Sequence, residues 1–320
     1  MRIVHELSEL PAAEHGRVLA IGNFDGVHLG HRKVIEKAVA RAAETGAEAT
    51  ILTFDPHPTQ LLRPDLPHDM LTTFEDKAEQ FARLGIGLTV CLHFTEAFAH
   101  HTPGHFVKTV LVPMGAKEVF VGANYKFGRH RSGDVTTLTE LGARYGFTVH
   151  PQEVFTRDGI RVSSSLIRAA LHKGDVARAN SLLAHPYCIK GKVVKGQARG
   201  RELGFPTANL DIPEELVPEN GVYAARVAVW DPEMPPDSTP DAFDAVVYIG
   251  TRPTFLESNR LIEVHVLDTH RELYGHRIRI DFADRVRPEM TFDNPDQLTV
   301  QIKKDVERAR QILKPGTPES

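Results

Sequence analysis

The feature that most constrains this chain is the stretch GNFDGVHLGHRKVIEKA, residues 22–38, which directly follows the short apolar run 17–21. The apolar run predicts a buried strand, and the residues after it predict a tight turn that enters a helix. A helix that begins right after a strand presents free backbone N–H groups and the positive end of its dipole to a ligand, and glycines let a phosphate come close. The stretch therefore predicts an anion site at a helix N-terminus.

Two histidines in the first helical turn of this stretch strengthen that interpretation. His28 and His31 are three residues apart, so they share one face of a helix. Imidazole donors beside a dipole end would stabilise the charge that builds up on a phosphate group during its transfer. The alternatives are histidines on the helix surface and a zinc site, although no other ligand cluster is spaced to complete such a site.

Length and composition indicate a soluble protein with two cores. The chain has 320 residues, 41% of them hydrophobic and 25% charged, with a net charge of −4. A negative net charge does not indicate a nucleic-acid partner. Residues 1–6 lack the apolar segment of a signal peptide, and no apolar run is long enough to span a bilayer. We expect a cytoplasmic protein whose two cysteines, Cys91 and Cys188, are reduced.

The first half of the chain alternates strand-like and helix-like segments. After the opening strand and helix, we expect strands over 48–54, 88–93, 117–122 and 147–154, and helices over 74–84, 103–112 and 137–145. This alternation predicts βαβ units and a mostly parallel sheet. Ligands bind beyond the carboxyl ends of such strands, where we expect the histidine-bearing turn to meet residues 54–56 and 122–128.

The second half changes character. The SSSLIR segment, residues 163–168, predicts a helical stretch that continues to about 183 with an interruption at 173–175. Strand-like runs then dominate, over 188–194, 221–230, 245–249, 262–267 and 278–282, and a helix is expected over 295–313. These short runs predict a small antiparallel barrel with a C-terminal helix, and the proline-rich residues 231–240 predict an exposed hairpin insertion.

The ordered motifs FDGVHLGH, SSSLIR, LGFPTAN and EVHVLD, together with GANYKFG, GVYAA, YIGTRPTF and LYG, resemble the bacterial bifunctional riboflavin kinase/FMN adenylyltransferase (FAD synthetase) family. The resemblance implies an α/β, Rossmann-like nucleotidyltransferase domain of the HxGH type over 1–184. It also implies a β-barrel riboflavin kinase domain with a C-terminal helix over 185–316, followed by a tail over 317–320.

The resemblance further implies two reactions on small-molecule substrates. The barrel would phosphorylate riboflavin to FMN with ATP and Mg²⁺, and the N-terminal domain would join FMN to the adenylyl group of ATP, giving FAD and pyrophosphate. No nucleic-acid or membrane partner is implied. The oligomeric state is left open, with a homo-oligomer as one option.

For the adenylyl-transfer site, the resemblance adds polar residues to His28 and His31. The implied nucleotide- and phosphate-binding residues are Asn23, Asp25, Gly26, Gly30, Asn124, Arg161, Ser164, Ser165 and Arg168. The family pattern usually has threonine where this chain has Ser165, which keeps the hydroxyl and loses a methyl group. Phe54 and Phe127 could stack on the flavin, with packing in the core as an equal alternative.

For the kinase site, a glycine-punctuated basic loop over 195–204 precedes the FPTAN motif. Glycines such as Gly204 permit close approach of the backbone to phosphates, although the loop is not a P-loop. The resemblance makes Thr207 and Asn209 the groups that bind the metal and the ATP phosphates, and Glu263 the catalytic base. Arg287 matches a position near the flavin.

Without the resemblance, these barrel residues would carry a plainer interpretation. Glu263 in an alternating strand is typical of an outward-facing glutamate, and Thr207 and Asn209 are typical of edges and turns.

The family usually has asparagine where this chain has Tyr248. Two alternatives to the bifunctional enzyme are adenylyl transfer with a barrel that only binds flavin, and a non-catalytic flavin- or nucleic-acid-binding protein. Negative charge and the lack of basic residues interleaved with exposed aromatics disfavour a nucleic acid.

Overall fold

The structure, a computed structural model, describes residues 1–65, 69–194, 205–211, 213–229, 241–252, 259–268 and 273–314. The chain divides into two compact units, Met1–His68 with Thr72–Ser164, and Asp69–Leu71 with Ser165–Ser320. Each unit has its own sheet, and each is described by itself. Within the described ranges, no helix combines the length and apolar character needed to cross a membrane.

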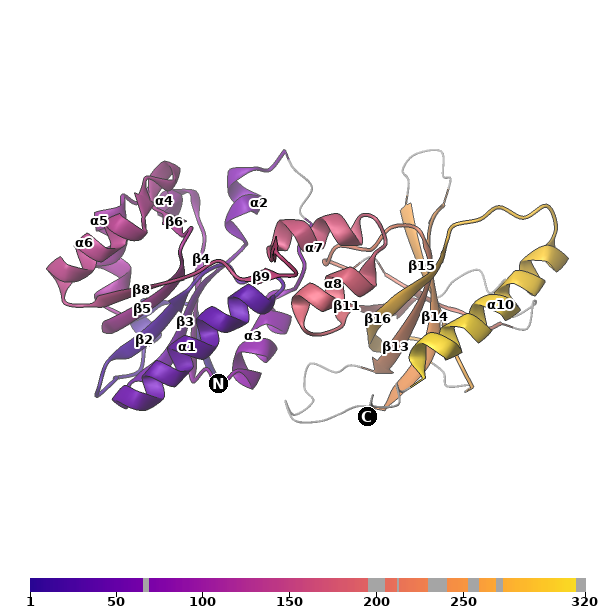
Figure 1. Ribbon diagram of the computed structural model, residues 1–320, viewed down its shortest axis with the longest axis horizontal. Helices are drawn as coiled ribbons and strands as arrows, with labels where there is room; N and C mark the ends of the chain where they lie inside the picture. The colour runs from indigo at the N-terminus through magenta and orange to yellow at the C-terminus, as the bar shows by residue number, and fades with distance from the viewer. Residues whose placement is uncertain are drawn as a thin grey trace. The chain divides into compact units, whose positions relative to one another are not determined.

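A six-stranded, fully parallel sheet forms the centre of the N-terminal unit, in the order β1-β4-β3-β2-β5-β8 (Figure 1). Its strands are β1 (Arg2–Val4), β2 (Arg17–Ile21), β3 (Glu48–Asp55), β4 (Leu88–His93), β5 (Ala116–Gly122) and β8 (Thr148–Gln152). The expected strands of this half are thus confirmed, and the three-residue β1 is an addition that was too short to predict.

Helices and short turns connect these strands. The helices are α1 (Leu29–Thr45), α2 (Pro58–Leu62), α3 (Phe74–Arg83), α4 (Glu96–Ala99), α5 (Pro103–Phe106) and α6 (Val135–Tyr145), with short turns η1 (Leu7–Glu9), η2 (Val107–Leu111) and η3 (Arg129–Arg131). Two small strand pairs complete the unit: β6 (Lys126–Phe127) with β7 (Gly133–Asp134), and β9 (Thr156–Arg157) with β10 (Ile160–Arg161). The helix predicted over 103–112 is therefore an α-helical turn that continues as a π-helical one.

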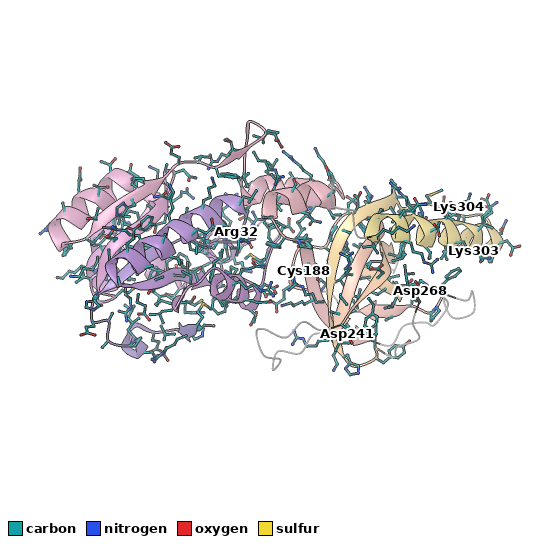
Figure 2. The ribbon with its side chains drawn as sticks, turned by 60° about the horizontal axis from the view of Figure 1, so that its bottom comes forward. Arg32, Cys188, Asp241, Asp268, Lys303 and Lys304 are labelled. Atoms are coloured by element: carbon teal, nitrogen blue, oxygen red, sulfur yellow. The ribbon has the colours of Figure 1, made fainter. Side chains whose placement is uncertain are left out.

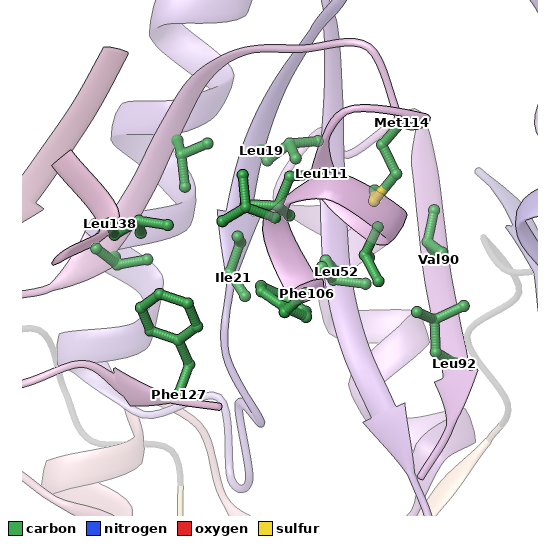
Figure 3. Close-up of a cluster of buried hydrophobic side chains, with 14 of the residues drawn as sticks. Leu19, Ile21, Leu52, Val90, Leu92, Phe106, Leu111, Met114, Phe127 and Leu138 are labelled. Carbon is green, nitrogen blue, oxygen red and sulfur yellow. The ribbon is translucent and has the colours of Figure 1, made fainter. Parts of the chain in front are cut away.

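Both faces of this sheet are buried, which explains why its strands are almost continuously apolar. On one face, Leu19 and Leu52 pack with Phe106 and Leu138 (Figure 3). The other face forms a second cluster, in which strand residues such as Val18, Ala20 and Ile51 meet α1 and α3 side chains such as Ile35 and Phe81. Side chains packed on both faces hold the sheet in place, and with it the edge at which its strands end.

The strand order reverses between β2 and β5, because β3 and β4 lie on one side of β2 while β5 and β8 lie on the other. In open α/β sheets, ligands bind at the carboxyl ends of the strands at such a switch point. Strands β3, β2 and β5 are parallel neighbours, so the three segments that follow them leave from the same edge. The prediction that these segments share one edge is confirmed.

The C-terminal unit contains α7 (Ser164–Leu171) from its second residue, α8 (Val176–Leu183), and a closed barrel in the order β11-β12-β15-β14-β13-β16 (Figure 1). The barrel strands are β11 (Tyr187–Val194), β12 (Ala208–Leu210), β13 (Gly221–Val229), β14 (Ala242–Arg252), β15 (Asn259–Val266) and β16 (Arg277–Pro288). All described pairings in it are antiparallel, as predicted. The structure adds β12 and extends β14 and β16 beyond the predicted runs.

Helix α10 (Pro295–Leu313) covers part of the outer face of the barrel. Val222, Ala224 and Val246 pack there with Val306 and Ala309 of the helix. The opposite side of the helix carries exposed charge, as Lys303 and Lys304 show in Figure 2. This amphipathic division confirms the predicted helix over 295–313.

Three predicted features lie outside the described residues. They are the glycine-punctuated loop 195–204, which includes Gly204, the proline-rich insertion 231–240, and the tail 317–320.

Candidate active sites

The histidine-bearing segment, residues 22–28, is called the phosphate turn below. It links β2 to α1 through an unusual backbone, because Phe24 has a φ of 52° and Val27 a φ of 39°. Bulky residues such as phenylalanine and Cβ-branched residues such as valine rarely adopt such left-handed angles, which cost about 1–3 kcal/mol each, and residues held in them cluster at functional sites. The backbone N–H of Val27 donates to the Phe24 carbonyl at 2.9 Å, and Val27 is fully buried. The fold thus holds a strained turn at the switch point of the sheet.

His28 forms the N-cap of α1, which begins at Leu29, so His28 lies just before the first helical turn in which it was predicted. The His28 Nδ1 atom accepts a hydrogen bond of 3.2 Å from the backbone N–H of His31. A neutral His28 ring then carries its proton on Nε2, which leaves that atom as a donor. Gly30 gives the ring its space, because a Cβ there would lie 3.1 Å from His28 Cε1.

The two histidine rings form a stacked pair, with centroids 3.6 Å apart and planes inclined by 15°. Burial, with a smaller contribution from the positive charge of Arg161, lowers the pKa of His28 to about 4. Burial also lowers the pKa of His31 well below its usual value, assisted by the charges of His28 and Lys77. Both rings are therefore neutral at about pH 7, and an anion at the helix end would favour their protonation.

The phosphate turn is held by residues from distant parts of the sequence. The Thr72 hydroxyl accepts from the backbone N–H of Gly26 at 3.0 Å, and the Thr72 backbone N–H donates to Asp25 Oδ1 at 3.3 Å. The Ser164 hydroxyl donates to the Asp25 carbonyl at 3.0 Å. Asp25 and Thr72 are both buried. The structure thus brings Asp25, Gly26 and Ser164 together as predicted, and adds Thr72, which the sequence did not single out.

The remaining predicted residues of this site are divided between the two units. The Asn23 carbonyl accepts from Thr53 Oγ1 at 3.4 Å, and Asn124 is exposed in the segment after β5. Arg161, on β10, is exposed and acts on the pKa of His28. Ser165 and Arg168 belong to the C-terminal unit, where Arg168 Nε donates to the Asp69 carbonyl at 2.6 Å.

The two phenylalanines with an open assignment pack in the core of the N-terminal unit. Phe54 is 8% exposed and contacts the rings of Phe94 and Phe98, with centroids 5.7 and 5.4 Å away. Phe127 is 7% exposed and contacts Phe106 and Tyr125. Both belong to one buried cluster, and the prediction that they also stack on the flavin stays a prediction.

In the barrel, strand register brings the predicted kinase residues onto one face. Asn209 lies directly opposite Glu263, and Glu263 opposite Tyr248. Tyr248 is opposite Val222, which is also opposite Arg287. Directly opposed residues of antiparallel strands point to the same face. These residues, called the outer row below, lie on the face that α10 partly covers. Glu263 therefore lies on the outer face, as the alternating pattern of its strand alone indicates, and its role as catalytic base stays a prediction.

The Arg287 end of the outer row carries a tightly held ion pair. Arg287 Nε lies 3.0 Å from both carboxylate oxygens of Asp305 on α10, and Arg287 Nη2 lies 2.9 Å from Asp305 Oδ2. Asp305 is 3% exposed and also accepts from Gln301 Nε2 at 2.8 Å. Helix α10 thus fixes the guanidinium of Arg287, and this pairing was not predictable from spacing alone.

Tyr248 occupies the middle of the outer row and is anchored to the strand end. Its hydroxyl donates to Glu289 Oε1 at 2.5 Å, and Asn220 Nδ2 donates to Glu289 Oε2 at 3.0 Å. Burial raises the pKa of Tyr248, and its hydrogen bond to Glu289 raises it further. Tyr248 is therefore a neutral phenol with a fixed orientation beside Glu263.

The donor set for a metal consists mainly of neutral oxygens. Asn209 on β12 is 6% exposed, and half-buried Thr207 precedes that strand by one residue. In the part of the chain that the structure describes, no group of three or more His, Cys, Asp and Glu side chains could hold a metal ion. An amide and a hydroxyl near one carboxylate suit a hard cation that keeps water and phosphate oxygens as its other ligands.

Comparison with known proteins agrees with this two-part architecture. The family described as FAD synthetase matches residues 10–166, and the family described as riboflavin kinase matches residues 183–313. Proteins named bifunctional riboflavin kinase/FMN adenylyltransferase are 36% identical to the chain in Escherichia coli (strain K12), covering 98% of the chain and 97% of that protein, and 36% identical in Bacillus subtilis (strain 168), covering 97% and 96%.

A solved structure shares the whole fold. The Streptococcus pneumoniae protein described as a macrolide-efflux protein superimposes with a TM-score of 0.86 at 27% identity, covering 97% of this chain and 98% of that one. The function named in that description is not transferred to this chain. The likeness supports the order and type of its helices and strands.

Fold and sites together define a two-domain phosphate-transfer enzyme, with an α/β nucleotidyltransferase domain followed by a kinase barrel. The chain belongs to the bifunctional riboflavin kinase/FMN adenylyltransferase family.

Proposed function

We propose that this chain makes FAD from riboflavin in two ATP-dependent steps, each at its own site. The barrel transfers the γ-phosphoryl group of ATP to riboflavin, and the N-terminal domain adenylylates the resulting FMN. The observation that carries the proposal is that both family matches occur in one chain, and that each half retains an ordered polar site. The functional domains are 1–184 and 185–316, with 317–320 as a tail.

Adenylyl transfer requires positioning and positive charge more than covalent help from the protein. A phosphate oxygen of FMN attacks the α-phosphorus of ATP, the bond from that phosphorus to the bridging oxygen breaks, and pyrophosphate leaves. The phosphate turn supplies backbone N–H groups at the start of α1, and His28 Nε2 donates to a phosphate oxygen. Asn23, Asp25, Gly26 and Gly30 shape the turn, and Asn124 positions the ligand.

The departing pyrophosphate needs cationic and hydroxyl donors. Ser164, Ser165, Arg161 and Arg168 take this role in the proposal, since arginine offers a planar fork of donors that matches phosphate oxygens. The lowered pKa values of His28 and His31 keep the two rings uncharged in the absence of ATP, and the negative charge of ATP would raise these pKa values. The two rings then accept positive charge only when the anion is present.

Riboflavin phosphorylation uses the outer row. Glu263 accepts the proton from the terminal ribityl hydroxyl as that oxygen attacks the γ-phosphorus of ATP, and ADP leaves. Thr207 and Asn209 would hold Mg²⁺ with the ATP phosphates, and Gly204, which is outside the described residues, would permit close approach of the backbone to those phosphates. When bound, the ion neutralises charge on the phosphates. Arg287, fixed by Asp305, contacts the flavin, and Phe54 and Phe127 serve the flavin at the other site.

The remaining parts of the proposal concern the setting of the enzyme. ATP, riboflavin and FMN are its small-molecule partners, and no nucleic acid or membrane takes part in either step. We place it in the cytoplasm, which agrees with Cys91 and Cys188 being buried thiols that form no disulfide with each other. Assembly into a homo-oligomer is not required by either mechanism.

The direct test is chromatography of flavins after purified protein is incubated with riboflavin, ATP and Mg²⁺. We expect FMN to rise first and FAD after it, and a parallel reaction started from FMN should give FAD and pyrophosphate. A chelator added in excess should stop FMN formation. If neither flavin is converted, the protein is a flavin-binding protein and the proposal fails.

A further inference from the structure

Helix α3 carries a lysine in an unusual place. Lys77 is 2% exposed and lies on the buried side of the helix with Ala78 and Phe81. Lysine is among the residues least often buried, because removing an ammonium group from water is unfavourable unless other groups compensate. We therefore looked for the groups that compensate Lys77 for its lost contact with water.

The contacts of Lys77 point to the phosphate turn. Its Nζ atom donates to the Asn23 carbonyl at 3.4 Å, and it lies 5.9 Å from the centroid of the Phe74 ring. The same carbonyl accepts from Thr53 Oγ1. Thr72, five residues before Lys77, binds Gly26 and Asp25. The N-terminal end of α3 and the residues before it thus hold the phosphate turn at several points.

The charges around Lys77 also converge on that turn. Burial lowers the pKa of Lys77, and the Asp25 carboxylate offsets part of this effect. The positive charge of Lys77 in turn contributes to the lowered pKa of His31. Lys77, His28 and His31 therefore form a group of basic side chains, partly or fully removed from water. An anion seated on the turn would be attracted by the charge of Lys77 and would favour protonation of the two histidines.

We propose that Lys77 is a positioning residue for adenylyl transfer, which fixes the Asn23 end of the phosphate turn and holds a buried positive charge behind the phosphates of ATP. This inference rests on the proposed function and deepens it. Lys77 acts through the turn, since its ammonium is enclosed by protein. In a water-poor setting, such a charge acts strongly on nearby phosphates without being reorganised during the reaction.

The test is Lys77→Met, which keeps the length of the side chain and removes its charge. We expect kcat for conversion of FMN to FAD to fall about 10- to 100-fold, because misplacing a reacting group slightly has effects of this size, with a smaller change in KM for ATP. Riboflavin phosphorylation should stay unchanged. The melting temperature should be unchanged or higher, since replacing a buried charge by an apolar side chain is often neutral or stabilising.

Two further variants make the result specific. Lys77→Arg keeps a charge and should recover part of the lost kcat, which a purely apolar packing role would not predict. Arg83→Met removes a charge from an exposed position on the same helix, where the side chain is 59% exposed, and should leave both activities unchanged.

The outcomes separate this inference from the proposed function. If the wild-type chain makes FAD and Lys77→Met makes it equally fast, only the role of Lys77 is overturned. A lower melting temperature with equal loss of both activities would show a structural role and would also overturn it. If the wild-type chain makes no FAD from FMN, adenylyl transfer itself fails, and this inference fails with it.

Discussion

The two candidate sites of this protein are built in different ways. The phosphate turn is a local structure, in which one strand end, one strained turn and one helix N-terminus bring His28 and His31 together. The outer row is assembled across strands, so that Asn209, Glu263 and Arg287 share a face only because of register. The first site depends on backbone conformation, and the second depends on pairing between distant segments.

This difference has consequences for how each site tolerates change. Buried, uncharged histidines and non-glycine residues at positive φ give the phosphate turn a cost in stability that substrate binding can offset. The residues of the outer row have no positive φ, and Arg287 is paired with Asp305. We therefore expect substitutions in the two sites to affect different reactions and different aspects of stability.

The largest effect is expected from Glu263→Gln. Removing the proton acceptor should lower the rate of FMN formation by about 10²–10⁴-fold, the usual contribution of a general base. Conversion of supplied FMN to FAD should stay within about twofold of the wild-type rate, because Glu263 belongs to the barrel. Chromatography of both reactions checks this, and equal loss of the two activities would contradict the separation of the sites.

His28→Asn should give the reverse pattern. Asparagine is a favourable N-cap residue, so the start of α1 is retained while the imidazole is lost. We expect FAD formation from FMN to fall about 10²–10³-fold, as for other lost donors to a developing charge, with riboflavin phosphorylation unchanged. A release assay for pyrophosphate measures the effect directly. FAD formation at the wild-type rate would show that His28 only caps the helix.

A smaller effect is expected from Thr207→Val, which replaces a hydroxyl by a methyl group of similar size. KM for ATP–Mg²⁺ in riboflavin phosphorylation should rise roughly tenfold, as for loss of one hydrogen bond or ligand oxygen. Thr207→Ser is the matched control, because it keeps the oxygen and should stay close to the wild type. The same KM for both variants would remove Thr207 from the kinase site.

The contrast between the sites also explains what could be predicted from the sequence. The strand, turn and helix around His28 lie within one short stretch, so their pattern is sufficient to predict the anion site. Thr72 and Lys77 contact the turn from 46 and 54 residues away, and nothing in their local pattern indicates this. A charged residue in the buried stripe of α3, next to Ala78 and Phe81, is the one signal that could have drawn attention to Lys77.

The barrel shows the complementary limit. Its strands were predictable from alternating runs, but the position of Asn209 opposite Glu263 depends on β12, which has three residues and too little pattern to predict. Family resemblance therefore identified Glu263, Thr207 and Asn209, while physical reasoning from the sequence placed Glu263 only on an outward face. The ion pair of Arg287 with Asp305 joins a strand to a helix and needs the folded barrel.

The smallest effect concerns the dependence of stability on pH, and it sharpens the contrast in stability between the sites. The pKa of His28 is about 4 in the folded protein, below the value of about 6.5 expected when it is unfolded. Between these values the unfolded chain binds more protons, so the free energy of unfolding falls as the pH decreases from about 6.5 to 4. For His28 the full loss is on the order of 3 kcal/mol, and the lowered pKa of His31 acts in the same direction.

His28→Asn should therefore make the stability of the N-terminal unit less dependent on pH across this range, because its N-cap does not titrate. Hydrogen exchange of amides in α1, followed by mass spectrometry at pH values from about 7 to 4.5 and corrected for the intrinsic exchange rate, measures this locally. The wild type should lose protection as the pH falls, and the variant should lose less. Strand β13 of the barrel serves as an internal reference, because the variant carries no change in that unit. Equal loss of protection in α1 of both proteins would mean that His28 is not desolvated in the folded state. The contrast in stability between the phosphate turn and the outer row would then depend only on the backbone conformation of the turn.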